Sequence, residues 1–283
     1  MKEMLQSLED RVVLLTGATG GLGEKLAMDL AAAGAGVLLH GRSPTKAKAV
    51  IEKIAETTGN PQLGYYNAEF SSLEDVRRMA EDIRADQARI DLLVNNAGIG
   101  PGRRGEERKL SKDGYELRFA VNYLAHFLLT HELLPLIRAS DSARIVNVAS
   151  GAQQAIDFDD VMLERNYDGR RAYSQSKLAQ VMFNFDLAEE LAETGISVNC
   201  LHPATLMPTT MVLETDFFNA TVDSVEKGAE AVLHLAASSE TSGISGRYFE
   251  GKTPAKADVQ AYDQEARERL RMMSRSFAGY IDR

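Results

Sequence analysis

Short, nearly continuous apolar runs recur along the chain, and amphipathic segments separate them. The runs are too short for buried helices and are rich in Val, Ile and Leu, which is typical of strands covered on both faces of a sheet. The segments between them have helical spacing, and several end at glycine, as helices commonly do. This alternation predicts an α/β fold with a seven-stranded parallel sheet and helices on both of its faces. The predicted strands begin at Arg11, Gly36, Leu63, Ile90, Ala143, Gly195 and Gly246.

The alternating pattern is not divided by any linker, repeat or low-complexity tract. We therefore predict that residues 1–283 form one domain. The composition is that of a globular protein, with 44% hydrophobic and 26% charged residues.

Charge and cysteine content narrow the class of protein further. The formal net charge of −9 argues against a nucleic-acid partner, because that partner requires a clustered basic face. Cys200 is the single cysteine, which rules out an internal disulfide and suits a reducing compartment. No apolar stretch reaches the roughly 20 residues that span a bilayer, and no signal-peptide core is present. We expect a cytoplasmic protein with no membrane partner.

A glycine-rich turn follows the first predicted strand, in the sequence TGATGGLG from Thr16. Glycines between a strand and a helix let the backbone approach a pyrophosphate, and the helix N-terminus favours its negative charge. Such a turn is typical of dinucleotide binding in a Rossmann fold, although a tight turn with no ligand has the same composition. Two glycine rhythms fit the turn equally well: Gly17, Gly21 and Gly23, or Gly17, Gly20 and Gly23.

The end of the second predicted strand bears on which dinucleotide is bound. An acidic residue about 20 positions past the loop is typical of NAD, whereas an arginine accommodates the phosphate of NADP. Here Arg42 and Ser43 stand at that point, and no Asp or Glu lies between Val37 and Lys48. A planar guanidinium matches phosphate geometry, so NADP(H) is favoured, with NAD(H) possible.

Tyr173 and Lys177 are four residues apart and would share one face of a helix. The phenol pKa of tyrosine, near 10, is about three units above neutrality, a gap of about 4 kcal/mol. A lysine charge about 4 Å away contributes on the order of 4 kcal/mol at an effective dielectric of ~20. The pair therefore predicts a tyrosine whose pKa is lowered by its lysine.

These motifs together resemble the short-chain dehydrogenase/reductase family over almost the full chain. TGATGGLG, NNAG from Asn95, the strand-closing Ser150 and YSQSK from Tyr173 occur in the family's order. NNAG and the modest length favour its classical branch over the extended branch, which contains sugar epimerases and dehydratases.

The resemblance implies roles for individual residues. Tyr173 would be the general acid in reduction and the base in oxidation, and Ser150 would hydrogen-bond the substrate oxygen. Lys177 would also bind the nicotinamide ribose, and Asn122 would hold a water linked to Lys177. The implied cofactor-binding residues are Thr16, Gly17, Thr19, Gly21, Leu22, Gly23, Arg42, Ser43, Glu69, Phe70, Asn96, Ala97, Gly98, Tyr173, Lys177, Pro203, Thr205 and Thr209.

The chain departs from the family pattern at two points. Glu69 and Phe70 stand where an aspartate–leucine pair often contacts the adenine, which leaves the next backbone amide to serve. Ala204 replaces a glycine after the sixth strand, while Thr209, or alternatively Thr210, remains a candidate for the nicotinamide carboxamide.

The insertion between Ser150 and Tyr173 resembles the branch of retinol dehydrogenases and WW-domain-containing oxidoreductases. This resemblance implies a lipophilic alcohol, aldehyde or ketone as the substrate.

A substrate lid is expected at about residues 206–225 and a C-terminal helix at about 256–275. Apolar lid residues would either line the pocket or pack the lid against the body, while Glu214 and Asp216 would disfavour anionic substrates. No metal is expected, because the histidines lack clustering with carboxylates. The residues concerned are Met211, Val212, Leu213, Phe217 and Phe218 in the lid, and His126, His131 and His202.

The sequence thus predicts an NADP-dependent alcohol dehydrogenase or carbonyl reductase acting on a small-to-medium, largely apolar substrate. Two alternatives are a non-catalytic protein that senses NADP and an epimerase or dehydratase of the extended type. The apolar surplus on the two helices that carry the chemistry is compatible with a homodimer or homotetramer.

Overall fold

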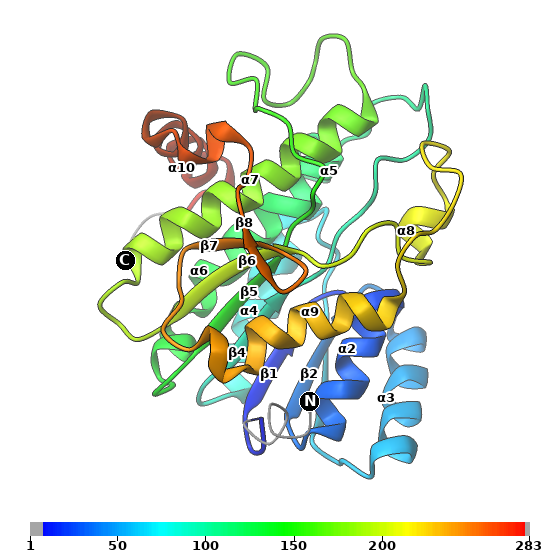
Figure 1. The fold of residues 1–283 in the computed structure, drawn as a ribbon, viewed down its shortest axis with the longest axis vertical. Helices are drawn as coiled ribbons and strands as arrows, with labels where there is room; N and C mark the ends of the chain where they lie inside the picture. The colour runs from blue at the N-terminus through cyan, green and yellow to red at the C-terminus, as the bar shows by residue number, and fades with distance from the viewer. Residues whose placement is uncertain (1–7, 281–283) are drawn as a thin grey trace.

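The computed structural model describes residues 8–280, whose strands form one eight-stranded sheet. The sheet order is β3-β2-β1-β4-β5-β6-β7-β8 (Figure 1). Every pairing from β3 to β7 is parallel, and β7 pairs with β8 antiparallel. The strands are β1 (Val12–Leu15), β2 (Gly36–Gly41), β3 (Leu63–Asn67), β4 (Leu92–Asn95), β5 (Arg144–Val148), β6 (Ser197–His202), β7 (Arg247–Glu250) and β8 (Thr253–Ala255).

The prediction of seven parallel strands is confirmed for β1 to β7 and wrong in omitting β8. Strand β8 is three residues long and contains Pro254, so it carries almost no apolar signal. A short turn at Gly251, whose φ is +59°, folds it back onto β7. Proline is tolerated there because β8 is an edge strand with no further partner to receive an N–H.

Helices cover both faces of the sheet (Figure 1). One layer contains α2 (Gly21–Ala32), α3 (Pro44–Thr58) and α9 (Val225–Ala237), and the other contains α4 (Leu73–Asp86), α6 (Ala125–Arg138) and α7 (Gly169–Glu190). The shorter elements and the last helix are α5 (Leu117–Phe119), the π-helix η1 (Ala120–Leu124), α8 (Thr210–Leu213), η2 (Ser239–Thr241), η3 (Val259–Tyr262) and α10 (Gln264–Ala278). Within residues 8–280, no helix combines the length and apolar character that crossing a membrane requires.

Each apolar strand contributes side chains to the hydrophobic cores on both faces of the sheet, because successive side chains of a strand point to opposite faces. In β1, Val13 and Leu15 join the core beneath α2 and α9, while Leu14 joins the core beneath α4, α6 and α7. This double burial explains why the runs are continuous rather than alternating.

The C-terminal helix α10 begins later than the predicted range of about 256–275. Residues 259–262 form the separate turn η3, and Asp263 caps α10 by accepting hydrogen bonds from the amides of Glu265 and Ala266. Helix α10 packs on α7 and η1, where Arg267 Nε lies 3.3 Å from Asp186 Oδ1. Much of the apolar surface of α7 is therefore buried within one chain.

The order of the strands indicates which edge of the sheet would bind a ligand. The chain runs outward from β1 to β3 and then returns to place β4 on the other side of β1. In open α/β sheets a ligand crevice lies outside the carboxyl ends of the strands at such a reversal. The glycine turn follows β1 and the NNAG segment follows β4, so both lie at this reversal.

Candidate active site

The glycine turn between β1 and α2 is shaped by three glycines. Gly17 and Gly21 have φ values of +67° and +54°, a backbone conformation that residues with a side chain rarely adopt. At Gly23 an added Cβ would lie 2.0 Å from the carbonyl oxygen of Gly17, whereas at Gly20 it would meet nothing within 4 Å. The backbone therefore requires glycine in the rhythm Gly17, Gly21, Gly23, and Gly20 is sterically free.

Helix α2 starts at this turn with no side chain capping it. Its first amides are consequently available to an anion, and the helix dipole favours negative charge there. Leu22 is buried beneath the turn. An uncapped helix N-terminus beside a turn that requires three glycines fits a dinucleotide pyrophosphate.

The NNAG segment is fastened to the glycine turn through Thr16. The Thr16 hydroxyl accepts hydrogen bonds from the amides of Asn96 and Ala97 at 2.8 and 2.9 Å. Asn96 Nδ2 in turn donates to the carbonyl of Thr16 at 2.9 Å. Both side chains thus face the protein, so their contribution is to hold two loops together.

His40, in β2, was missed by the sequence analysis and also holds the glycine turn. Its Nδ1 accepts a hydrogen bond from the Gly17 amide at 3.2 Å, and its Nε2 donates to the carbonyl of Ala68 at 3.2 Å. Burial lowers the pKa of His40 to about 4, so the ring is neutral and able to accept. A lone histidine inside the apolar run GVLLHG was the available signal.

Arg42, directly after β2, projects from the protein beside the crevice. Its side chain is 70% exposed, and its Nη1 lies 3.6 Å from Glu69 Oε2. Ser43 accepts a hydrogen bond from the Lys46 amide and so caps α3. Thr19, in the glycine turn, packs against Gly41, which brings the turn next to Arg42. The guanidinium is therefore exposed beside the glycine turn, where it could contact an anionic group.

The residues after β3 divide between the surface and the core. Glu69 is partly exposed, whereas Phe70 is buried and stacks on His40 with ring centroids 4.2 Å apart. The Phe70 ring is thus directed into the core, and only its backbone could serve a cofactor. The side-chain contacts common at this point of the family are accordingly not available from Phe70.

Ser150, Tyr173 and Lys177 converge beside these loops. Ser150 follows β5, and the other two residues lie one turn apart on α7. The Ser150 hydroxyl lies close enough to Tyr173 to lower the Tyr173 pKa, and Lys177 Nζ lies 5.8 Å from the centre of the Tyr173 ring. A phenol, a hydroxyl and an ammonium so arranged can transfer a proton and stabilise the charge that remains.

The predicted direction of the Tyr173 pKa shift is wrong for this structure. Burial raises the Tyr173 pKa, and the hydrogen bond from Ser150 offsets that only in part. Burial also lowers the pKa of Lys177 to about 7. The prediction assumed a fully charged lysine about 4 Å away in a polar medium, whereas Lys177 is buried and its Nζ lies 5.8 Å from the ring centre of the partly buried Tyr173.

Asn122 lies in the π-helix η1 and acts on the loop after β4. Its Oδ1 accepts from the Ile99 amide at 2.8 Å, and its Nδ2 donates to the Ile99 carbonyl and to Ser176 Oγ at 3.1 and 2.9 Å. Every polar atom of the side chain therefore has a partner other than Lys177. These bonds fasten the NNAG loop to α7, whereas a water linking Asn122 to Lys177 stays a prediction.

The segment after β6 crosses the crevice. Pro203 and Ala204 are buried at its start, and Thr205 Oγ1 lies 3.2 Å from His202 Nε2. Thr209 then packs against Gly21, since a Cβ on that glycine would lie 3.0 Å from the Thr209 methyl group. This contact brings α8 close to the start of α2 (Figure 1).

Met211, in α8, covers the proposed proton donor. Its Sδ lies 4.0 Å from the Tyr173 hydroxyl, and an added Cβ on Gly100 would lie 2.8 Å from its Cγ. Farther along, Thr215 Oγ1 donates to the carbonyl of Gly102 at 2.6 Å, and the Arg104 amide donates to Asp216. The segment from Thr209 to Asp216 is therefore closed over Tyr173 and bonded to the loop after β4.

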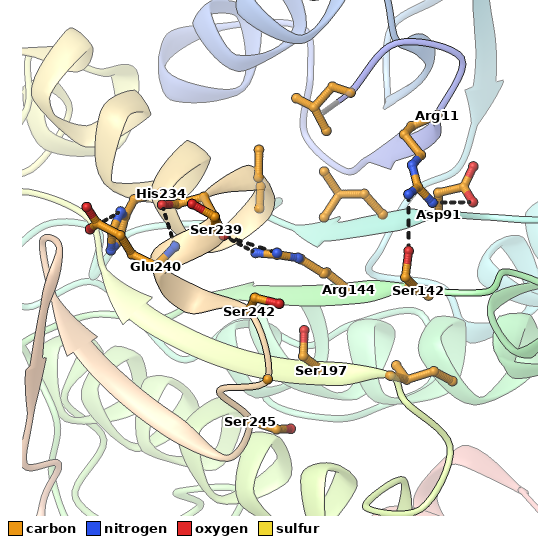
Figure 2. A pocket seen from close by; sticks show the side chains of 18 of the residues that line it. Arg11, Asp91, Ser142, Arg144, Ser197, His234, Ser239, Glu240, Ser242 and Ser245 are labelled. Atoms are coloured by element: carbon orange, nitrogen blue, oxygen red, sulfur yellow. Dashed lines mark hydrogen bonds and ion pairs between the residues drawn. The ribbon is translucent and has the colours of Figure 1, made fainter. Parts of the chain in front are cut away.

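A wide hollow in the described part of the chain lies at the opposite end of the sheet. It is an open depression of about 1200 Å³ near the starts of β1, β4, β5 and β6 (Figure 2). Arg144 there donates to the carbonyls of Leu235 and Ser238 at the end of α9, and Arg11 donates to Ser142. Both cations have partners, and the lining of this hollow includes neither a tyrosine nor the glycine turn. The surroundings of Tyr173 are therefore the candidate active site.

Replacing Gly23 with alanine is expected to destabilise the protein by about 1–3 kcal/mol, as overpacking in a well-packed region does. The added methyl group would press on the Gly17 carbonyl and on Asn96 Nδ2, 2.8 Å away, and would distort the nucleotide cradle. Thermal unfolding measures the loss, and NADPH titration by nicotinamide fluorescence is expected to give weaker binding. Gly20→Ala is the matched control for unfolding, because its methyl group meets nothing. Equal effects of the two substitutions on Tm would contradict the steric argument.

Comparisons with known proteins agree with this geometry. The family model described as short chain dehydrogenase matches residues 11–217. Retinol dehydrogenase 13 from Homo sapiens is 34% identical over 279 residues, covering 93% of this chain and 83% of the relative. An uncharacterized protein from Mycobacterium paratuberculosis has a crystal structure with a TM-score of 0.78 at 28% identity, covering 96% of this chain and 95% of that one. A short chain dehydrogenase from Escherichia coli CFT073 complexed with NADPH has a TM-score of 0.72 at 27% identity, covering 87% and 99%.

Proposed function

Because the chain belongs to the short chain dehydrogenase family, we propose that it is an oxidoreductase that uses NADP(H) to interconvert an alcohol and a carbonyl compound. The observation that carries the proposal is the convergence of Ser150, Tyr173 and Lys177 beside a turn whose backbone requires glycine at three positions. Proton transfer and charge stabilisation are what carbonyl reduction requires of a protein. When bound, the nicotinamide cofactor supplies or accepts the hydride.

In this proposal Tyr173 and Ser150 act on the substrate oxygen. The Tyr173 hydroxyl gives its proton to the oxygen during reduction and takes it back during oxidation. Ser150 donates a hydrogen bond to the same oxygen as negative charge develops on it. Lys177 stabilises the tyrosinate that remains, and this stabilisation is strong because Lys177 is only 3% exposed.

The preference for NADP(H) over NAD(H) rests on Arg42. Its exposed guanidinium lies at the end of β2, where the adenosine ribose of a dinucleotide is held in this type of fold. The similar E. coli protein complexed with NADPH supports the same choice.

The proposed substrate is a largely apolar aldehyde or ketone, and the segment at about 206–225 is its lid. Met211 lies against the Tyr173 hydroxyl, so a thioether and not a charged group would meet the substrate. Glu214 and Asp216 in the same segment would disfavour an anion. A relative named retinol dehydrogenase, at 34% identity, is compatible with an apolar substrate.

The proposal is tested by following NADPH oxidation at the nicotinamide absorbance with a panel of aldehydes, ketones and quinones, and with NADH in parallel. We expect turnover with NADPH and apolar carbonyl compounds. Tight NADPH binding with no turnover across the panel would contradict the proposal and favour a cofactor-sensing protein. A cofactor-dependent epimerisation or dehydration without net NADPH consumption would favour the extended-type alternative.

A further inference from the structure

Gln180 lies one turn beyond Lys177 on α7 and has no part in the mechanism given above. Its side chain is 1% exposed, and that of Lys177 is 3% exposed. A glutamine buried this deeply needs partners for both its carbonyl and its amide group. The partner of its side-chain carbonyl is the ammonium group of Lys177.

The lysine ammonium is held at two points. Lys177 Nζ donates to Gln180 Oε1 at 2.8 Å and to the carbonyl of Val148, at the end of β5, at 3.0 Å. An ammonium has three hydrogens and cannot accept, so the carbonyl side of the Gln180 amide must be the side that faces it. Two hydrogens are thereby used and the third remains for the crevice, where an added Cβ on Gly98 would lie 3.7 Å from Nζ.

The ionisable groups around Lys177 offer it no negative charge near pH 7. Tyr173 lies on the same helix, His126 on α6 and His202 at the end of β6. Burial lowers the pKa of His126 to about 3 and also lowers that of His202, while it raises the pKa of Tyr173. All three are therefore neutral, and the two carbonyl oxygens are what stabilises the ammonium.

We propose that Gln180 is a positioning residue that holds the Lys177 ammonium at the edge of the crevice through its side-chain carbonyl. The inference rests on the proposed function, in which a charged Lys177 assists Tyr173. It adds a residue that keeps the lysine charged and directs its third hydrogen toward the site. Neither the glycine turn nor the YSQSK motif contains this residue.

The first test is the titration of Lys177 followed by NMR of protein labelled with ¹³Cε-lysine. The Lys177 signal is the one that disappears in Lys177→Met. In the wild-type protein its pKa is expected at about 7. Gln180→Met removes the carbonyl at similar volume, and it is expected to lower that pKa by about one to two units, since a hydrogen bond to a charged group is lost. Gln180→Glu keeps the shape and adds a negative charge, so it is expected to raise the pKa.

Gln175→Met is the matched control. Gln175 is a buried glutamine of the same helix, whose Nε2 donates to the carbonyl of Ala155 at 2.7 Å, away from Lys177. It is expected to leave the Lys177 titration unchanged, although it could lower Tm as Gln180→Met does. An unchanged Lys177 pKa in both Gln180 variants, or an equal shift in the control, would overturn the inference.

A kinetic readout separates this inference from the proposed function. In alcohol oxidation the activity rises as Tyr173 loses its proton, and a less charged lysine raises the Tyr173 pKa. The acid limb of the pH profile is therefore expected to move to higher pH in Gln180→Met. Wild-type protein without turnover would contradict the proposed function, while the NMR titration would still decide the role of Gln180. Turnover that depends on Tyr173, together with an unmoved titration, would leave the function intact and reject the positioning role.

Discussion

Replacing Tyr173 with phenylalanine is expected to lower NADPH-dependent carbonyl reduction by about a thousandfold, the middle of the range for a lost general acid. The substitution removes one hydroxyl and keeps the ring that lies 5.8 Å from Lys177 Nζ. Stopped-flow or steady-state measurement of NADPH oxidation gives the loss in kcat. The dissociation constant of NADPH is expected to change little, because the glycine turn and Arg42 are untouched.

Tyr66→Phe is the matched control for this result. The Tyr66 hydroxyl donates to Asp86 at 3.1 Å, between β3 and the end of α4 and away from the crevice. Its loss is expected to leave kcat near the wild-type value. If Tyr173→Phe retained comparable activity, the proton would have to come from another group, and the assignment of Tyr173 would be wrong.

Replacing Arg42 with aspartate is expected to reduce the preference for NADPH over NADH by about a hundredfold. A hydrogen-bonded guanidinium–phosphate contact contributes about 1.5–3 kcal/mol, and the carboxylate would in addition repel the phosphate. The introduced carboxylate would also stand beside Glu69, which now lies 3.6 Å from the guanidinium, so two carboxylates would face the same anion. The ratio of kcat/KM for the two cofactors measures the change.

The control for charge reversal is Arg78→Asp. Arg78 is an exposed residue of α4 that pairs with Asp75 at 2.9 Å, on the other face of the sheet from α2 and α3. It changes the net charge equally and is expected to leave the cofactor preference as it is. A preference that survived Arg42→Asp would show that the phosphate is bound by other groups, and the argument for NADP would then fail.

The positions of the central strands followed from local sequence because these parallel strands are buried on both faces. In β4, Leu92 and Val94 pack in one core and Leu93 in the other, so three successive apolar residues identify the strand without knowledge of its neighbours. Strand β8 was missed because it lies at an edge, and its sequence TPA has no such requirement.

For the candidate site, the sequence identified the residues but not their surroundings. The residues of its motifs could be listed from the sequence, since Tyr173 and Lys177 are one helical turn apart and the glycines mark a turn. The environment of those residues could not be derived. The raised pKa of Tyr173 arises from its burial, with Met211 of α8 against its hydroxyl. The hydrogen bond between His40 and Gly17 joins β2 to the turn after β1.

The sequence by itself determined the α/β architecture, the nucleotide turn, the family resemblance and the residues able to transfer a proton. These depend on periodicity and short spacings, which are properties of neighbouring residues. Only the tertiary structure decided that Gly20 is sterically free and that Met211 lies against the Tyr173 hydroxyl. It also decided that Asn122 hydrogen-bonds to the backbone of Ile99, and that Lys177 donates to both Val148 and Gln180. Such contacts depend on how strands and loops far apart in the chain meet at one edge of the sheet, and local patterns do not encode those distances.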